Sequence, residues 1–246
     1  LDTAIHETEA IIAKLKAVKQ GLLHDLLTRG LDANGELRPP QAEASHLYKE
    51  SPLVLPKVRL LDRFMTGHRG FVAGGCFKNI FSDTKLKDID LFFEESRDFE
   101  DAEIYFNESD NFSFCYKNDN CISYIDKDTQ VRVELIHKTF GTPESILEMF
   151  DFTITKVAYF KEYIITEDGT ESVYSLLIHE KFFQDLVNKK LVIDDKLLFP
   201  VSSFERSYRY AKYGFGLCKE SKGLLIEALR TADTNDLSDA LYNGID

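Results

Sequence analysis

The most restrictive feature of the sequence is a pair of aspartates inside an apolar segment. Asp88 and Asp90 flank Ile89 in the run DIDLFF. On a β-strand, residues two apart point to the same face, so both carboxylates share a face while Ile89 points into the core. The two carboxylates are then about 6–7 Å apart, and their like charges repel each other. A hydrophobic core does not need such a pair, but a divalent cation such as Mg²⁺ removes the conflict.

A third carboxylate is expected on a neighbouring strand. In VRVELIH, apolar residues alternate with Arg132 and Glu134, so Glu134 lies on the polar face of the predicted strand. Together with Asp88 and Asp90, it completes a metal site of the kind used for in-line phosphoryl transfer. We therefore predict these three residues to be catalytic and to hold Mg²⁺ or Mn²⁺.

Two glycines upstream predict a phosphate-binding turn. Gly74 and Gly75 end the predicted strand GFVAGG, and a helix is expected to begin in FKNIFSD. Glycine lets the backbone approach a ligand closely, and N–H groups at a helix N-terminus favour a phosphate. Lys78 adds a positive charge nearby. The order of strand, glycine pair, helix, Asp-x-Asp strand and Glu-bearing strand is more specific than any of its parts.

This order resembles the polymerase-β-like nucleotidyltransferase superfamily. The twelve residues between Gly75 and Asp88 match the spacing in the head domain of tRNA nucleotidyltransferases and bacterial poly(A) polymerases. GGCFKNIF, KDIDLFF and GTPESILEMFDFTITKVAY are similar to nucleotidyltransferase-like proteins of phages and prophages. The resemblance covers roughly residues 58–215 and implies an α+β fold with a mixed sheet. It also implies that Gly74 and Gly75 hold the triphosphate of an NTP.

The resemblance does not extend to substrate choice. The tRNA-type pattern has Arg-Asp where this chain has Lys78 and Asn79, and the Ser that follows the first glycine in other branches is absent. Lys78 keeps a positive charge near the phosphates, so this departure does not exclude the chemistry. We leave the acceptor open between an RNA and a protein hydroxyl.

A basic and aromatic segment follows further along the chain. In SSFERSYRYAKYGFG, helical spacing brings Arg206, Arg209, Lys212 and Tyr213 close to one face. Such groups clamp a triphosphate and stack a base, so we predict all four as nucleotide-binding. The alternative is a solvated basic helix face beside a tyrosine-lined core.

Other elements are expected from local signals. Thr142, Pro143 and Glu144 predict a helix start, and that helix would run to about Phe150, with Asp151 as a cap or turn residue. A short helix is expected in VRLLDRFM and a strand in CISYID. A hairpin or two edge strands are expected in FTITKVAYF and EYIITEDG, and a helix around HEKFFQDLVNKK.

The first part of the chain has a different character. Residues 1–29 carry apolar side chains at helical spacing, which is typical of a long amphipathic helix. The seam repeats over about three heptads, so pairing as a coiled coil, with a second copy or another chain, is expected. The sequence begins with Leu in mid-helix, so we expect residue 1 not to be a natural start, or the sequence to be part of a longer product.

The segment LDTAIHETEAIIAKLKAVKQGLLHDLLTRGLDANGELRPP, followed by EASHLYKESPL, resembles the central conserved segment of type I restriction-modification specificity subunits. The resemblance covers residues 1–53 and implies a docking or spacer helix. No target-recognition domain follows it, which weakens the hypothesis that the whole chain is a DNA specificity subunit. A natural fusion and an attachment by rearrangement or by design stay open. We predict two parts, residues 1–55 and 56–246.

Composition narrows the class of partner. The net charge is −12, which disfavours wrapping of a long nucleic acid, although a small basic site remains compatible with an acidic body. The four cysteines form no CxxC pair, which argues against a zinc site or a disulfide framework. No membrane-spanning run or signal peptide is recognisable, so we expect a cytoplasmic protein without a membrane partner.

These observations favour a Mg²⁺-dependent nucleotidyltransferase that moves a nucleoside monophosphate from an NTP to an acceptor hydroxyl. The alternative is a non-catalytic module with the same fold, such as an adaptor, antitoxin or phage-defence component, docked through a restriction-modification-type helix. The acidic composition suits a protein partner, which keeps this alternative open.

Overall fold

The computed structural model describes residues 46–166, 169–194 and 197–231. The chain divides after His46. The amphipathic helix predicted for residues 1–29 lies outside the described residues. Strand β1 (Leu47–Glu50) pairs with β8, so residues 47–50 belong to the sheet of the second unit.

The described residues form a mixed sheet with helices, as expected for the α+β class. Every neighbouring pair of strands in this eight-stranded sheet is antiparallel except β3 and β6, which are parallel. The spatial order is β1, β8 (Gly169–His179), β7 (Val157–Thr166), β2 (Phe71–Ala73), β3 (Asp88–Phe92), β6 (Arg132–Ile136), β5 (Cys121–Asp126) and β4 (Phe112–Lys117). The strands predicted in GFVAGG, DIDLFF, CISYID and VRVELIH are confirmed.

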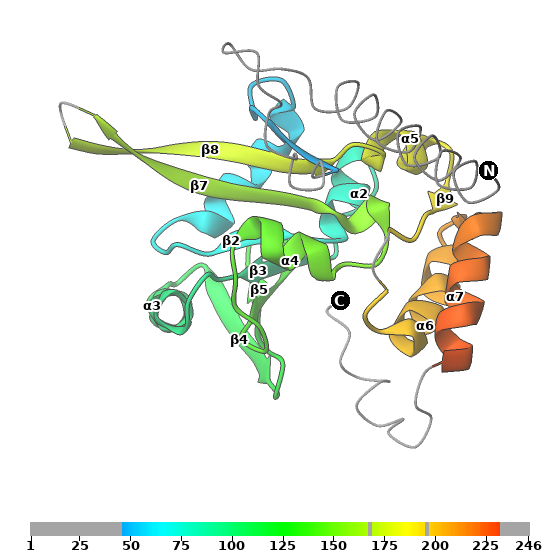
Figure 1. Ribbon diagram of the computed structural model, residues 1–246. Helices are drawn as coiled ribbons and strands as arrows, with labels where there is room; N and C mark the ends of the chain where they lie inside the picture. Colours follow the sequence, from blue (N-terminus) through cyan, green and yellow to red (C-terminus); the bar gives the residue numbers. More distant parts are fainter. Residues whose placement is uncertain (1–45, 167–168, 195–196, 232–246) are drawn as a thin grey trace, which may run out of the picture. The chain divides into compact units, whose positions relative to one another are not determined.

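Helices pack on the sheet and on each other (Figure 1). Helix α3 (Ser96–Glu108) contacts β4 and β6, and α4 (Pro143–Met149) contacts β2 and β7. The other helical elements are η1 (Pro56–Met65), α2 (Cys76–Phe81), η2 (Thr153–Thr155), α5 (Phe182–Val187), α6 (Pro200–Ala211) and α7 (Lys219–Thr231). Helices α6 and α7 lie side by side, and the short strands β9 (Lys190–Leu191) and β10 (Gly216–Leu217) pair in parallel.

Local sequence signals explain several element boundaries. Helix α4 begins where expected, because the Thr142 side chain accepts a hydrogen bond from the Ser145 amide (3.3 Å) and Pro143 occupies the first turn. The segment VRLLDRFM is helical within the 3₁₀ helix η1. Side chains tie η1 to the sheet, since the Tyr159 hydroxyl donates to Asp62 (2.6 Å) and Arg63 donates to Asp126 (2.8 Å).

A long hairpin is present, but it is not the one predicted, because FTITKVAYF and EYIITEDG both contribute to the single strand β7 and its partner β8 was not predicted. Strands β7 and β8 pair over their whole length, from Val157 opposite Ile178 to Thr166 opposite Gly169. In Figure 1 the hairpin extends beyond the other strands. Its base lies next to β2, where Tyr159 and Ala158 face Val72 and Ala73. The hairpin base therefore supports the strand that leads into the glycine turn.

A buried ion pair joins helix α6 to the segment after α4. Asp151 lies in a bend, and its carboxylate has a structural role beyond the turn or cap expected from the sequence. Arg206 donates from both Nε (3.0 Å) and Nη2 (2.6 Å) to Asp151 Oδ2. Arg206 and Asp151 are 4% and 5% exposed, so the guanidinium is used inside the fold and does not face solvent.

Replacement of Arg206 by Met is expected to destabilise the protein by about 3–5 kcal/mol, because it leaves Asp151 buried without its counter-ion. Arg209, one turn later on α6, is exposed. The matched Arg209→Met change should therefore alter the free energy of unfolding by no more than about 0.5 kcal/mol. Urea unfolding followed by circular dichroism measures both. Equal stability of the two variants would contradict a structural role for Arg206.

Candidate nucleotide site

The two aspartates and Glu134 lie on adjacent strands of the sheet. In the parallel pairing of β3 with β6, Asp88 is opposite Arg132 and Asp90 is opposite Glu134. Asp88 is exposed, Asp90 and Glu134 are half-buried, and Ile89 is buried. This alternation is the one expected for a strand with carboxylates on one face. The backbone therefore brings Asp90 and Glu134 directly across from each other.

Glu134 has two partners, of which the sequence placed Arg132 on the same strand face but did not indicate Tyr116. The Tyr116 hydroxyl donates to Glu134 Oε1 at 2.6 Å, and Arg132 Nη1 lies 3.8 Å from the same oxygen. The hydrogen bond to Glu134, followed by burial, raises the pKa of Tyr116 to about 12. The phenol therefore stays protonated at neutral pH and remains the donor in this contact.

The donor set fits Mg²⁺ in chemistry and in backbone position. Magnesium prefers oxygen ligands and is usually held by one or two carboxylates together with waters and substrate phosphates. Within the part of the chain that the structure describes, no three His, Cys, Asp or Glu side chains are gathered closely enough to hold a metal ion by themselves. Asp90 and Glu134, one residue on each of two paired strands, suit an ion that is completed by a nucleotide.

The negative charge of the carboxylates contributes to the pKa of two cysteine thiols, Cys76 and Cys121. Burial, with added repulsion from Asp90 and Asp88, raises the pKa of the Cys76 thiol well above its ordinary value. Burial, with Glu134 and Asp90, raises the pKa of Cys121 to about 11. Both thiols are therefore protonated at neutral pH, which disfavours either as a nucleophile. In both thiols burial is the larger cause, and the neighbouring carboxylates add to it.

The glycine turn lies close to Asp90. Gly74 has φ +99°, a conformation that other residues rarely adopt, and a side chain added there would come within 3.8 Å of Asp90 Oδ2. A side chain on Gly75 would lie 3.3 Å from the Tyr210 hydroxyl. Helix α2, which follows, has only six residues, so its dipole adds little. The turn thus brings the backbone close to the carboxylates and to α6.

A small cleft opens beside the turn and gathers positive charge. Its volume is about 80 Å³, and it is lined by Gly75, Lys78, Asn79, Lys87, Asp88, Arg209, Tyr210 and Tyr213. Three of these residues are cationic and one is acidic. In a chain of net charge −12, this local excess of positive charge stands out against the average composition.

The two lysines of the cleft converge on one aromatic ring. Lys78 Nζ lies 4.8 Å and Lys87 Nζ 5.5 Å from the centroid of the Tyr213 ring. Lys78 also donates to Asn79 Oδ1 at 2.7 Å. Cation–π attraction offsets part of the repulsion between the two ammonium groups. The ring therefore holds two positive charges together at the cleft.

The structure separates the predicted nucleotide-binding residues into two sets. Gly75, Lys78, Arg209 and Tyr213 line the cleft together with Asp88, and Gly74 adjoins it. Arg206 faces Asp151, and Lys212, at the exposed end of α6, is not among the lining residues.

Three lining residues, Asn79, Lys87 and Tyr210, were not among the predicted site residues. Lys87 directly precedes Asp88, and its position beside the aspartates was the available signal. Tyr210 lies one turn before Gly214 on the tyrosine-rich segment, but its approach to Gly75 depends on how α6 packs.

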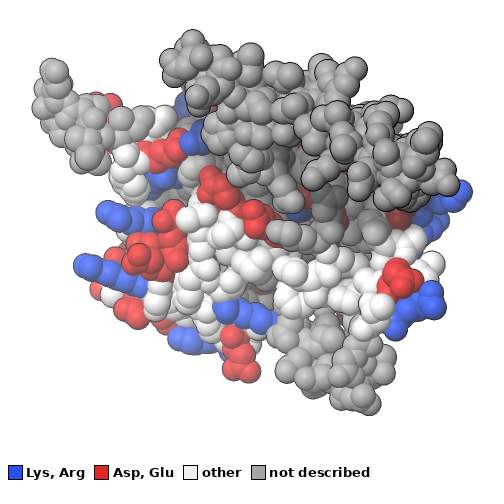
Figure 2. All heavy atoms as spheres, in the orientation of Figure 1, with Lys and Arg blue, Asp and Glu red and all other residues white. Residues whose placement is uncertain are grey.

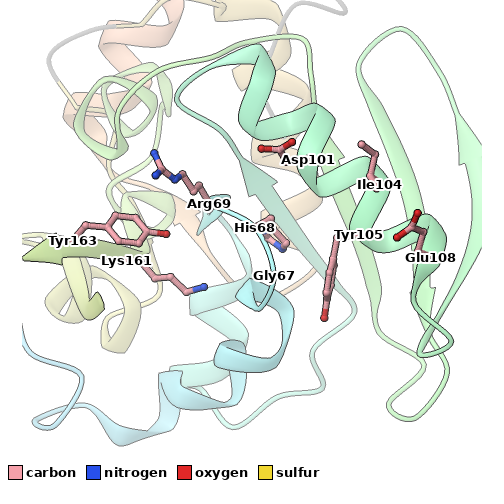
Figure 3. A pocket seen from close by; sticks show the side chains of 9 residues that line it. All are labelled: Gly67, His68, Arg69, Asp101, Ile104, Tyr105, Glu108, Lys161 and Tyr163. Carbon is pink, nitrogen blue, oxygen red and sulfur yellow. The ribbon is translucent and has the colours of Figure 1, made fainter. Parts of the chain in front are cut away.

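A second, larger pocket lies beside the loop that leads into β2 (Figure 3). Its volume is about 610 Å³ and its lining includes Arg69, Lys161, Asp101 and Glu108. Two cations and two anions leave no excess of positive charge, and burial lowers the pKa of the adjacent His68 to about 4, so its imidazole is neutral at pH 7. The small cleft is therefore the better site for a polyphosphate.

The surface offers no reason to expect a long nucleic-acid track on the visible side. On the face shown in Figure 2, the described Lys and Arg side chains are scattered among Asp and Glu side chains. None of the described helices is long and apolar enough to cross a lipid bilayer.

Solved structures with a similar arrangement are CCA-adding enzymes. One CCA-adding enzyme in complex with CTP is 21% identical to this chain, with a TM-score of 0.47. The match covers 74% of this chain and 42% of the enzyme chain. A complex with ATP is 19% identical with a TM-score of 0.49, and covers 79% and 48%. The Thermotoga maritima enzyme with tRNA is 21% identical with a TM-score of 0.47, and covers 74% and 43%. The chain thus spans less than half the length of these enzymes, and a likeness of this size says nothing about activity.

Sequence comparison is more specific. No curated protein matches the chain. The family model described as Gabija anti-defense 2 family protein matches residues 50–189, which is more than half of the 246 residues. The match begins where β1 ends, so the resemblance of residues 1–53 to restriction-modification subunits stays a prediction. The chain belongs to the Gabija anti-defense 2 family.

Proposed function

We propose that the protein is a Mg²⁺-dependent nucleotidyltransferase that acts against the Gabija defence. It would transfer a nucleoside monophosphate from an NTP to a hydroxyl of an RNA or a protein and release pyrophosphate. The family name supports the biological role, and the site supports the chemistry. The single observation that carries the chemistry is the cationic cleft beside Asp88, adjacent to the Asp90 and Glu134 pair.

Opposite charges are adjacent at this site, as nucleotidyl transfer requires. Lys78, Lys87 and Arg209 would bind the triphosphate, and the Gly74–Gly75 turn would let it approach the backbone. A cleft of about 80 Å³ is smaller than the ~300–1,000 Å³ of typical ligand pockets. It would therefore hold phosphate groups, with the ribose and base outside.

Asp88, Asp90 and Glu134 are the residues that would hold the metal, with its remaining ligands supplied by the nucleotide and by water. When bound, Mg²⁺ supplies neutralisation of phosphate charge and a lower pKa for the acceptor hydroxyl. Asp88 reaches the cleft, so it would link the metal and the phosphates. Glu134 lies on the far side of Asp90 from the glycine turn, so it would face the acceptor.

A non-catalytic module is the second candidate, and one observation favours it. Glu134 Oε1 accepts the Tyr116 hydroxyl at 2.6 Å, so the third carboxylate is already satisfied without a metal. In such a module the acidic residues would serve a protein partner of the Gabija defence. The coiled-coil pairing predicted for residues 1–29 would then supply docking.

Mg²⁺ together with an NTP is expected to raise the melting temperature of the protein, by an amount corresponding to about 2.7 kcal/mol at 100 times Kd.

Lys87→Met keeps the apolar stem and removes the charge. It should weaken NTP binding roughly 10- to 100-fold, as loss of a charge-assisted hydrogen bond costs about 1.5–3 kcal/mol. Lys222→Met, on the exposed side of α7, is the control. Equal affinity in the two variants would remove the cleft as the nucleotide site.

Phage plating on bacteria that carry the Gabija defence distinguishes the two candidates. The wild-type chain should restore plating, and the Asp88→Asn, Asp90→Asn double variant should not. The double variant is expected to fold at least as stably as wild type, because two neighbouring charges are removed, and thermal unfolding checks this. Full restoration by a folded double variant would favour the non-catalytic module.

A further inference from the structure

Tyr116 occupies a distinctive place relative to the carboxylates. A row of opposed residues crosses four strands, running from Asp90 on β3 to Glu134 on β6, Ser123 on β5 and Tyr116 on β4. Neighbouring strands are about 4.8 Å apart, so the Tyr116 backbone lies two strands from Glu134. The phenol therefore leans back across β5 to reach Glu134 Oε1 at 2.6 Å.

The small side chain of Ser123 makes this reach feasible. Ser123 is 0% exposed, and it is the residue between Tyr116 and Glu134 in the row. A larger side chain at this position would occupy the space over β5 that the phenol crosses. The chain is also irregular there, because the β4–β5 register shifts between Phe114 and Tyr116. Both features aim the Tyr116 hydroxyl toward the predicted metal site.

The contact has the geometry of a nucleophile and its base. A base must lie about 2.6–3.2 Å from the proton-bearing atom, and a third group commonly orients it. Glu134 meets the first condition. Arg132 Nη1, 3.8 Å from Oε1, meets the second. Tyr116 is only half-buried, so part of the residue is accessible from solvent.

We propose that Tyr116 is an acceptor for the protein's own nucleotidyl transfer, so that the enzyme modifies itself on a phenolic hydroxyl. The inference rests on the proposed function and names the acceptor class that it left open. The Tyr116 oxygen forms a bond to the α-phosphorus of the NTP, and its proton passes to Glu134. The bond from the α-phosphorus to the bridging oxygen of the β-phosphate breaks. Pyrophosphate leaves with that electron pair.

Two other tyrosines with defined hydroxyl partners do not combine an accessible side chain with a carboxylate partner. Tyr159 also donates to a carboxylate, Asp62, at 2.6 Å, but its side chain is 0% exposed. Tyr124 donates to the amide oxygen of Asn107, which is not a base. Tyr208, on α6, is 61% exposed and lies outside the proposed site. It serves as the matched control for an accessible tyrosine.

The experiment is incubation of the full chain with each NTP and Mg²⁺, followed by intact mass measurement and peptide mapping. Wild type and Tyr208→Phe should each gain the mass of one nucleoside monophosphate, located on Tyr116. Tyr116→Phe and the Asp88→Asn, Asp90→Asn double variant should gain none. Peptide mapping of the wild type locates the modified residue without depending on how any variant folds.

The outcomes separate this inference from the proposed function. A Mg²⁺-dependent rise in melting temperature with an NTP, but no mass gain, would overturn only the acceptor role of Tyr116. The same holds if Tyr116→Phe gains mass as wild type does, or if mapping places the group elsewhere. If no NTP shifts the melting temperature, the proposed function and this inference are both overturned.

Discussion

The parallel pairing of β3 with β6 determines most of what this protein can do. It places Asp90 opposite Glu134 and Asp88 opposite Arg132, on strands whose alternate residues are buried. The fold thereby holds like charges near each other on the exposed face, and nothing in the hydrophobic core benefits from their closeness. Their repulsion is a cost that a bound cation would offset. A structural explanation alone leaves that cost unexplained, which is why we interpret this face as functional.

The positive cleft is the counterpart of these carboxylates. The chain is strongly acidic as a whole, yet Lys78, Lys87 and Arg209 converge beside Asp88 from α2, the loop before β3, and α6. Two neighbouring segments and the sequence-distant helix α6 are thus required to form it, and Tyr213 holds two of the cations together. A polyphosphate needs a local concentration of cations and gains nothing from the average charge of the surface. The net charge therefore disfavours a long nucleic-acid track without disfavouring a nucleotide.

Local patterns were sufficient to predict β2, β3, β5, β6 and the start of α4, but not β4, which carries Tyr116. The alternation at Asp88 to Asp90 and at Arg132 to Glu134, and the cap at Thr142, depend only on neighbouring residues. The local patterns could not predict tertiary contacts. Arg206 has the spacing of a ligand-binding residue, but it faces Asp151, fifty-five positions earlier. Tyr116 reaches Glu134 only because β4, β5 and β6 pair in one register.

The most direct test of the account is a crystal structure with Mg²⁺ and a non-hydrolysable NTP analogue. We expect Mg²⁺ bound by Asp88 and Asp90, with one carboxylate oxygen of Glu134 toward the ion or its water and Oε1 still accepting from the Tyr116 hydroxyl. The phosphates should lie against Lys78, Lys87 and Arg209. Binding of the nucleotide in the pocket lined by Arg69 and Lys161, or the absence of any metal near Asp90 while the nucleotide is bound, would contradict the account.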